Sequence, residues 1–297
     1  MPIFFIIPQN KIFWGIFAAA LLIVVIGLWD DKKDRSPYTR FFLNFLVAAI
    51  TVASGVGIPY ITNPFGGVIH LDTWIINFDI FGPHKIIVWA DIFALIWIVW
   101  CMNMVNWSKG VDGQMPGFVA ISSLTIGILS LRFSQFDIAQ INITYLAILT
   151  TGSFLGFLWW NFYPQKIMPG YGGGALAGFM LAVLSIFSYG KLGTMLLVLG
   201  VPVTDAIYTL VRRLFYRQSP FKPDKEHLHH KLLAIGWGKR RIAFFYWFIS
   251  AVLGFIALNL SSKQKLFAFV LIGALIVGFI IWISRLSKIK GVEEEEI

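Results

Sequence analysis

Long runs of apolar residues, separated by short polar segments, follow one another along the whole chain of 297 residues. Most runs hold about 17–22 residues, which is enough for a helix to cross a hydrocarbon core of roughly 30 Å. They lack the residue-by-residue alternation of apolar and polar positions that marks a membrane β-barrel. The pattern therefore predicts an all-α, polytopic integral membrane protein with about nine transmembrane helices. The expected spans are 12–29, 41–62, 84–105, 117–132, 142–160, 173–189, 191–211, 242–260 and 265–284.

The composition agrees with a membrane protein and excludes several other classes. Hydrophobic residues make up 58% of the chain and charged residues 13%, whereas soluble proteins carry about 25% charged residues. The one cysteine, Cys101, excludes a disulfide within the chain and is expected to pack as a small apolar residue. The net charge of +9 accompanies no soluble basic domain, so no nucleic-acid partner is expected. Residues 1–297 are interpreted as a single integral-membrane domain.

The distribution of lysine and arginine predicts the orientation in the membrane. Eighteen of the 24 lie in alternate loops on one side, and the other six lie on the opposite side. Short loops rich in lysine and arginine stay cytoplasmic. This places residues 63–83 outside the cell and predicts a multi-pass protein of the plasma (inner) membrane. The expected cytoplasmic segments are 27–37, 106–116, 161–172, a long basic loop at 212–241 and an acidic, disordered tail at 286–297.

Polar residues that a membrane span does not need gather at or near the cytoplasmic ends of the spans. They are Asp30 and Asp31 in GLWDDKKDRSP, Asn103, Asn106, Lys109 and Asp112 in NMVNWSKGVDG, and Asp205 in GVPVTDAIYTLVRR. The glycine-rich segment MPGYGGGALAG, with Gly170 and Tyr171, opens a span on the same side. Such convergence on one side is what an active site at the membrane surface would produce. Simpler explanations stay open: interfacial helix ends for the acid pair, hydrogen bonds between helices for the asparagines, and close helix packing for the glycines. A glycine-rich helix start can instead cradle a phosphate, and an acid inside a span marks function or a buried pair.

The segment DKEHLHH holds the densest cluster of candidate chemistry. Asp224, His227, His229 and His230 lie within seven residues and include three of the five histidines. Histidine can bind a diphosphate or a metal, or transfer protons near neutral pH. A zinc site is the alternative interpretation, although no cysteine and few carboxylates accompany the histidines.

Taken in order, these segments resemble the polyprenyl-phosphate N-acetylhexosamine-1-phosphate transferase family, which includes phospho-N-acetylmuramoyl-pentapeptide transferase. The resemblance runs from about residue 12 to about residue 285. GLWDDKKDRSP is similar to the family's Asp-Asp motif, and NMVNWSKGVDG to its Asn-x-x-Asn-x-x-Asp-Gly-x-Asp-Gly motif. VPVTDAIYTLVRR resembles its Pro-x-x-Asp helix, and SPFKPDKEHLHHKL its His-x-His-His loop.

The resemblance implies a reaction and a role for each candidate residue. Polyprenyl (undecaprenyl) phosphate would attack the β-phosphorus of a UDP-amino sugar such as UDP-GlcNAc, giving polyprenyl-diphospho-sugar and UMP and initiating a cell-envelope glycan. Mg²⁺ or Mn²⁺ is the implied cofactor, and a homodimer is the implied assembly. Asp30 and Asp31 would hold the metal and activate the lipid phosphate, with Asp112 assisting. The implied nucleotide-sugar contacts are Asn103, Asn106, Lys109, Asp224, His227, His229 and His230, and the implied site-shaping residues are Asp205, Gly170 and Tyr171.

The sequence departs from the family motifs at two acidic positions. Lys109 stands where the family has the first aspartate of Asp-Gly-x-Asp-Gly, and Tyr171 stands where it has an aspartate that serves Mg²⁺. A second hypothesis is therefore a catalytically reduced relative that binds polyprenyl phosphate or a UDP-sugar without turnover. A third is an unrelated transporter, whose spans should show an internal repeat. No such repeat is visible in the sequence.

Overall fold

The computed structural model describes residues 7–63, 65–79, 83–188, 191–219 and 226–295, and most of them are helical. The helices are α2 (Lys11–Lys32), α3 (Pro37–Ala53), α4 (Val88–Trp107), α5 (Gln114–Phe133), α6 (Gln140–Asn161), α7 (Gly170–Phe187), α8 (Lys191–Val198), α9 (Gly200–Phe215), α10 (Leu228–Ala234), α11 (Lys239–Asn259) and α12 (Ser262–Glu295). The strands are β1 (Tyr60–Thr62), β2 (Val68–His70), β3 (Ile75–Asp79) and β4 (Pro83–Ile87).

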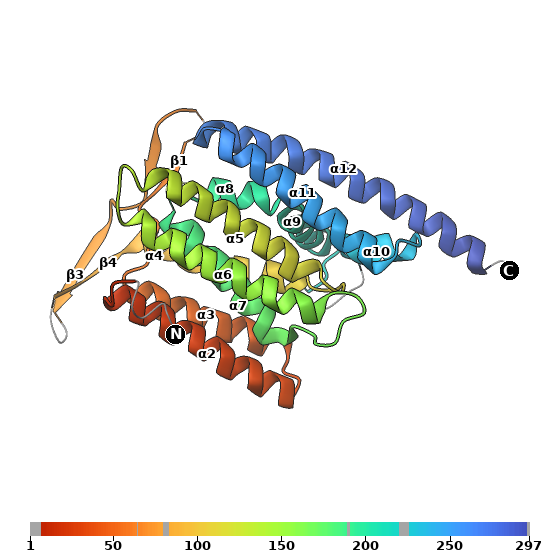
Figure 1. Cartoon of the computed structure of the whole chain (residues 1–297), viewed down its shortest axis with the longest axis horizontal. Coiled ribbons are helices and arrows are strands. Elements are labelled where there is room, and N and C mark those ends of the chain that lie inside the picture. The colour runs from red at the N-terminus through yellow and green to blue at the C-terminus, as the bar shows by residue number, and fades with distance from the viewer. Residues whose placement is uncertain (1–6, 64, 80–82, 189–190, 220–225, 296–297) are drawn as a thin grey trace.

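The long helices lie side by side along the longest axis of the molecule (Figure 1). The hairpins β1–β2 and β3–β4 extend from one end of this bundle, and α10 lies at the other end. Seven described helices are long and apolar enough to cross a membrane: α2, α4, α5, α6, α7, α11 and the first part of α12. Large side chains such as Leu21, Ile148 and Leu271 remain exposed on the outer helices, as expected for faces that contact lipid. The prediction of an all-α multi-pass membrane protein is confirmed.

The predicted span at 41–62 is wrong in its second half. Helix α3 ends at Ala53, Gly55 adopts a φ of +110°, and the chain continues into β1. A glycine with positive φ just after a helix closes it, and Pro59 cannot donate a helical backbone hydrogen bond. The predicted outward loop at 63–83 accordingly includes residues of the two hairpins.

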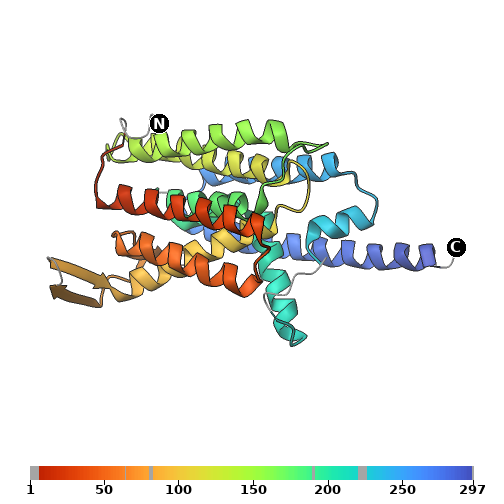
Figure 2. The ribbon, with the colours of Figure 1, turned by 90° about the horizontal axis from the view of Figure 1, so that it is seen from below.

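The predicted span at 191–211 is not one straight helix. It divides into α8 and α9, which are bent by 86° relative to each other. Gly200 and Pro202 lie at the start of α9, where a proline is tolerated because the first helical N–H groups lack partners anyway. Figure 2 shows α9 projecting away from the bundle. The count of nine spans is therefore not confirmed: the described helices give seven, or eight if the bent pair crosses once.

The C-terminal parts of the chain also differ from the prediction. The structure continues α12 to Glu295, whereas a disordered tail was expected from residue 286. The expected loop at 212–241 contains the end of α9, all of α10 and the start of α11. Asp224 lies outside the described residues.

Two close helix crossings position the end of the bundle that carries Asp30. A Cβ atom added to Gly27 in α2 would lie 2.7 Å from Gly172 Cα in α7, and one added to Gly178 would lie 2.3 Å from the Cys101 carbonyl oxygen in α4. Small residues allow helix backbones to approach this closely in membranes. The glycines of the GYGGGALAG segment therefore serve helix packing, and they bring the start of α7 against the ends of α2 and α4.

Candidate active site

The two adjacent aspartates at the end of α2 have different surroundings. Asp30 is 7% exposed, and its two oxygens accept hydrogen bonds from Arg40 Nε at 2.8 Å and Arg40 Nη2 at 3.1 Å. It also accepts the Arg35 backbone N–H at 3.3 Å. Asp31 is exposed, and its carboxylate has no hydrogen-bond or salt-bridge partner in the described part of the chain. Asp30 is thus committed to a bidentate ion pair, whereas Asp31 remains available to a ligand.

Arg40 and Tyr171 form the side of the site next to Asp30. Arg40, in the first turns of α3, also contacts Asp34, and its guanidinium lies 5.5 Å from the centre of the Tyr171 ring. Tyr171 is 5% exposed, and its hydroxyl donates to Asn44 Oδ1 at 2.5 Å. The tyrosine therefore offers a neutral, hydrogen-bonded group at a position where the resemblance implied a metal-binding carboxylate.

Lys109 places a positive charge beside the acid pair. Its ammonium donates to the Gly170 carbonyl oxygen and interacts electrostatically with Asp30, Asp31 and Arg40. Burial, reinforced by Arg40, lowers the pKa of Lys109 to about 8, and the two carboxylates oppose this shift. Gly170 has a φ of +56°, a conformation that glycine adopts without strain. At neutral pH most Lys109 side chains are protonated, so the site contains an ammonium of its own.

The loop that carries Lys109 connects the acid pair to the histidine segment. A Cβ atom added to Gly110 would lie 2.1 Å from His229 Nε2, so the imidazole packs directly on the glycine backbone. The rings of His227 and His229 are stacked with centroids 5.8 Å apart, and those of His229 and His230 are 4.3 Å apart. The described structure therefore brings the histidines and the Lys109 loop into contact.

Asp205 fixes the position of this histidine segment. The residue is 2% exposed, and its carboxylate accepts the His227 Nδ1–H at 2.9 Å and the Leu228 backbone N–H at 2.9 Å. The second bond satisfies a free N–H at the start of α10, and the first holds the His227 ring. Asp205 thus acts on the site through His227.

His229 is electrically neutral in this arrangement. Burial is the largest cause that lowers the pKa of its imidazole well below the ordinary value, and His230 and His227 contribute further. A neutral imidazole can donate one hydrogen bond and accept another. His229 can therefore hydrogen-bond a phosphate oxygen, but it does not supply a positive charge at neutral pH.

Asp112 is buried and already paired. Its Oδ1 lies 2.9 Å from Lys239 Nζ, at the start of α11, and its Oδ2 accepts the Gln165 backbone N–H at 3.2 Å. Asn161 supports the same loop by accepting the Gly113 N–H at 3.0 Å. These contacts tie the 161–169 segment to α5 and α11, so the structure gives Asp112 an anchoring role.

The two asparagines of α4 differ from each other. Asn103 donates to the Val99 carbonyl oxygen of its own helix at 2.7 Å, and it lines an apolar cavity of about 250 Å³ with Phe41 and Trp107. Asn106 Oδ1 is buried without a hydrogen-bond partner among the described residues and lies 2.5 Å from a Cβ added to Gly174. Hydrogen bonding between helices therefore does not account for Asn103, and Asn106 keeps an unsatisfied acceptor near the start of α7.

The described side chains do not form the acidic metal site that the resemblance implied. No group of three histidine, cysteine, aspartate or glutamate side chains that could hold a metal gathers within the described ranges, which also leaves the zinc alternative without support. Mg²⁺ prefers carboxylate and phosphate oxygens. Arg40 and Lys239 already pair two of the three candidate carboxylates, and Lys109 lies beside the third. The residues present therefore do not fit a metal ion held by several protein carboxylates.

Sequence reasoning missed Arg40, Asn44 and Lys239. Arg40 lies ten residues after Asp30 in the next helix, a spacing that alone indicates no contact. Lys239 is the first residue of α11, where a cation is disfavoured by the helix dipole unless an anion is near. That mismatch was the available signal for a carboxylate partner, which the structure identifies as Asp112.

Replacing Asp205 with asparagine is expected to loosen the histidine segment. The amide has one acceptor oxygen, so either the His227 N–H or the Leu228 N–H loses its buried partner. We expect a loss of about 1–3 kcal/mol, seen as a melting temperature lower by about 2–10 °C in detergent. Limited proteolysis should also cleave the segment that follows residue 215 faster than in the wild type. The exposed Asp79→Asn is the control, and an unchanged melting temperature and cleavage pattern in Asp205→Asn would contradict the anchoring role.

Comparison with known proteins identifies the family. The family model of glycosyl transferase family 4 matches residues 13–189. The chain is 27% identical over 288 residues, covering 95% of it and 74% of the relative, to a probable undecaprenyl-phosphate N-acetylglucosaminyl 1-phosphate transferase of Bacillus subtilis (strain 168). It is 30% identical over 287 residues, covering 89% of it and 68% of the relative, to a decaprenyl-phosphate N-acetylglucosaminephosphotransferase of Mycobacterium tuberculosis (strain ATCC 25618 / H37Rv).

A third relative is a phospho-N-acetylmuramoyl-pentapeptide-transferase of Lactococcus lactis subsp. cremoris (strain SK11), 30% identical over 259 residues that cover 82% of this chain and 73% of the relative. The alignments extend beyond the family match and include most of the described helices. The resemblance read from the motifs is confirmed, and the chain belongs to glycosyl transferase family 4.

Proposed function

We propose that this protein transfers N-acetylglucosamine-1-phosphate from UDP-GlcNAc to polyprenyl phosphate, as the first step of a cell-envelope glycan. An oxygen of the lipid phosphate forms a bond to the β-phosphorus of the nucleotide sugar. The bond from that phosphorus to the bridging oxygen breaks, and the oxygen leaves with UMP. The observation that carries the proposal is the meeting of three groups: an exposed carboxylate at Asp31, a half-buried ammonium at Lys109 and a histidine stack packed on Gly110.

The proposed roles follow from the charge of each group. Phosphoryl transfer depends chiefly on positioning and on stabilising the charge of the phosphate oxygens. Lys109 supplies a fixed positive charge for the diphosphate. Asp31, whose carboxylate has no hydrogen-bond or salt-bridge partner among the described residues, accepts the proton that the lipid phosphate loses. The neutral His229 hydrogen-bonds the nucleotide phosphate, and Asp205 holds the neighbouring His227 in place.

The family usually supplies positive charge with Mg²⁺, and this chain offers a different source. Because Asp30 is paired with Arg40 and Asp112 with Lys239, we propose that Lys109 takes over the charge-neutralising part of the metal's task. The substrate diphosphate then meets an ammonium that the fold holds in place, at a position where the family motif has an aspartate.

The proposed location is the plasma membrane, with Asp31, Lys109 and the histidines on the cytoplasmic side. Support comes from the excess of lysine and arginine at this end of the chain's helices. A UDP-sugar is a cytoplasmic metabolite in the proposed reaction, and a polyprenyl phosphate presents its head group at the membrane surface. The end of α2 lies where both substrates could meet.

A second candidate function is binding without turnover. The observations that favour it are the replacement of two family acids by Lys109 and Tyr171 and the pairing of Asp30 and Asp112 with cations. Such a protein would still hold a UDP-sugar or polyprenyl phosphate through Lys109 and the histidines. It would lack the release of UMP.

The test is an assay of the purified protein in detergent with UDP-GlcNAc and undecaprenyl phosphate. We expect UMP and a lipid-linked sugar phosphate to appear in equal amounts, and neither to appear when the lipid is omitted. Binding of UDP-GlcNAc by calorimetry without UMP release would favour the second candidate. Absence of both binding and UMP release, in a protein that elutes as a single folded species, would contradict both.

A further inference from the structure

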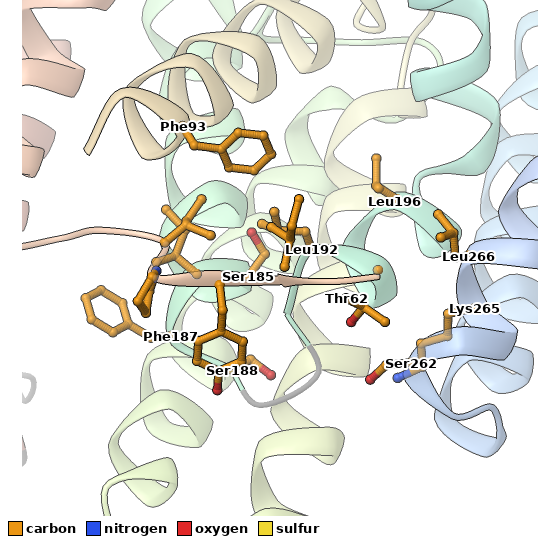
Figure 3. Close-up of a pocket in the computed structure, with 16 residues that line it drawn as sticks. Thr62, Phe93, Ser185, Phe187, Ser188, Leu192, Leu196, Ser262, Lys265 and Leu266 are labelled. Carbon is orange, nitrogen blue, oxygen red and sulfur yellow. The ribbon is translucent and has the colours of Figure 1, made fainter. Parts of the chain in front are cut away.

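A cavity of about 300 Å³ lies at the end of the bundle that carries the hairpins (Figure 3). Its walls come from the segment around β1, the end of α7, α8 and the start of α12. Helix α7 runs from Gly170 at the candidate active site to Phe187 at this cavity. Eighteen helical residues span about 27 Å at 1.5 Å per residue, so the cavity is separate from the acid pair and the histidines.

A buried ammonium group lines this cavity. Lys265, in the first turn of α12, is 4% exposed, and its Nζ donates to Thr194 Oγ1 at 2.9 Å. Across the described ranges, no aspartate or glutamate oxygen lies within salt-bridge distance of this nitrogen. An ammonium has three N–H donors, and Thr194 uses one. Lys265 therefore carries a buried charge without a carboxylate, together with spare donors.

Two hydroxyl groups accompany this charge. Figure 3 shows Thr62, Ser262 and Lys265 gathered at one side of the cavity. In the part of the chain that the structure describes, neither the Thr62 nor the Ser262 hydroxyl has a hydrogen-bond partner. One ammonium and two free hydroxyls on one side make a set of donors suited to the oxygens of an anion.

The rest of the cavity is mostly apolar, with Ser185 and Ser188 also in its lining. Its lining includes Phe93, Leu192, Leu196 and Leu266, which in Figure 3 lie above the polar side. A ligand that fills both parts must carry an anion next to hydrocarbon. Inorganic phosphate satisfies only the polar part, and a neutral glyceride satisfies only the apolar part.

We propose that this cavity binds the phosphate of an anionic membrane lipid, with the glycerol and first methylenes against the apolar wall. Helices α7 and α12 both qualify as membrane spans, so their ends lie at the depth of lipid head groups. An ionisable side chain within a span is costly unless paired and usually marks a binding site. The lipid phosphate supplies the counter-charge that Lys265 lacks. The proposal does not depend on the transfer reaction at the other end of the bundle.

The test compares three lysine variants of the full chain in neutral detergent. Lys265→Met removes the charge and keeps most of the length of the side chain. Lys265→Arg keeps the charge, and Lys263→Met is the matched control on an exposed lysine two residues earlier. Each protein is titrated with phosphatidylglycerol, dioleoylglycerol or inorganic phosphate. Bound lipid is counted by native mass spectrometry, and the melting temperature is recorded.

Phosphatidylglycerol is expected to bind and to raise the melting temperature of the wild type, Lys263→Met and Lys265→Arg. Its affinity for Lys265→Met should be weaker by about tenfold or more, because a charge-assisted hydrogen bond is lost. A Thr62→Val, Ser262→Ala double variant should be weakened as well, and this provides a second test if Lys265→Met does not fold. Equal phosphatidylglycerol affinity in wild type and both variants would overturn the proposal. So would an equal effect of inorganic phosphate or of dioleoylglycerol.

Discussion

Replacing Lys109 with methionine is expected to reduce UMP release by about 100-fold or more, without unfolding the protein. Removing one donor that stabilises the charge of a transition state typically costs this much in rate. Methionine keeps the unbranched chain as far as Cε, so most of the packing beside Gly170 is preserved while the ammonium is lost. Added Mg²⁺ should not restore the rate, because Asp30 stays paired with Arg40.

The pH dependence of the wild-type rate gives a second test of the role of the Lys109 ammonium. Because burial lowers the pKa of Lys109 to about 8, the fraction that carries a positive charge falls as the pH rises through 8. The rate should fall with it, and Lys109→Arg should keep its activity to higher pH. Lys166→Met, on an exposed lysine of the neighbouring loop, is the control that removes one positive charge outside the site. A Lys109→Met enzyme with the wild-type rate would show that the ammonium has no part in transfer.

Asp31→Asn and Asp30→Asn are expected to affect the transfer rate and the melting temperature differently. Asp31 is exposed and has no hydrogen-bond or salt-bridge partner in the described residues, so its replacement should leave the melting temperature within about 1 °C of the wild type. Loss of a proton acceptor should nevertheless lower the transfer rate by about 100- to 10,000-fold. The variant should still bind UDP-GlcNAc, because the proposed nucleotide contacts remain.

Asp30→Asn removes the anion that faces Arg40, so it should lower both the rate and the melting temperature. The comparison of the two variants in a thermal-shift assay and a UMP assay therefore separates a reacting carboxylate from a structural one. If Asp31→Asn retains the full rate, the exposed aspartate is only the polar end of α2. If Asp30→Asn is as stable as the wild type, the ion pair between Asp30 and Arg40 does not stabilise the fold.

The sequence was informative wherever a strong apolar pattern or a local motif acted alone. Seven of the expected spans correspond to helices that could cross a membrane, because span length and hydrophobicity depend on the bilayer rather than on distant contacts. Asp205 was expected to be buried and site-shaping, and the structure buries it against His227. An acid within an apolar helix needs a partner, and that physical requirement is visible in the sequence.

The errors occurred where short breaks in the apolar pattern redirect the backbone. Gly55 and Pro59 end α3 early, and Gly200 with Pro202 accompanies the bend between α8 and α9. A single glycine or proline hardly changes the mean hydropathy of a predicted span. Their effect is on backbone dihedrals and hydrogen bonds, so it changes the path of the chain without changing its apolarity.

The contacts of the site were the part that required coordinates. Arg40 with Asp30, and Lys239 with Asp112, pair residues that lie 10 and 127 positions apart in the chain. Nothing in either local motif indicates that its carboxylate is already bound to a cation. The same limitation applies to Lys109, whose substitution was visible while its position beside Asp31 was not.

We propose that this site transfers a sugar phosphate with an ammonium from the chain in place of a protein-bound metal. The most direct measurement is UMP release by the wild-type protein with UDP-GlcNAc and undecaprenyl phosphate in excess EDTA, compared with the same assay in Mg²⁺. We expect UMP release in EDTA at a rate comparable to that in Mg²⁺, and loss of that release in Lys109→Met. Release that requires Mg²⁺, or no release under either condition, would contradict it.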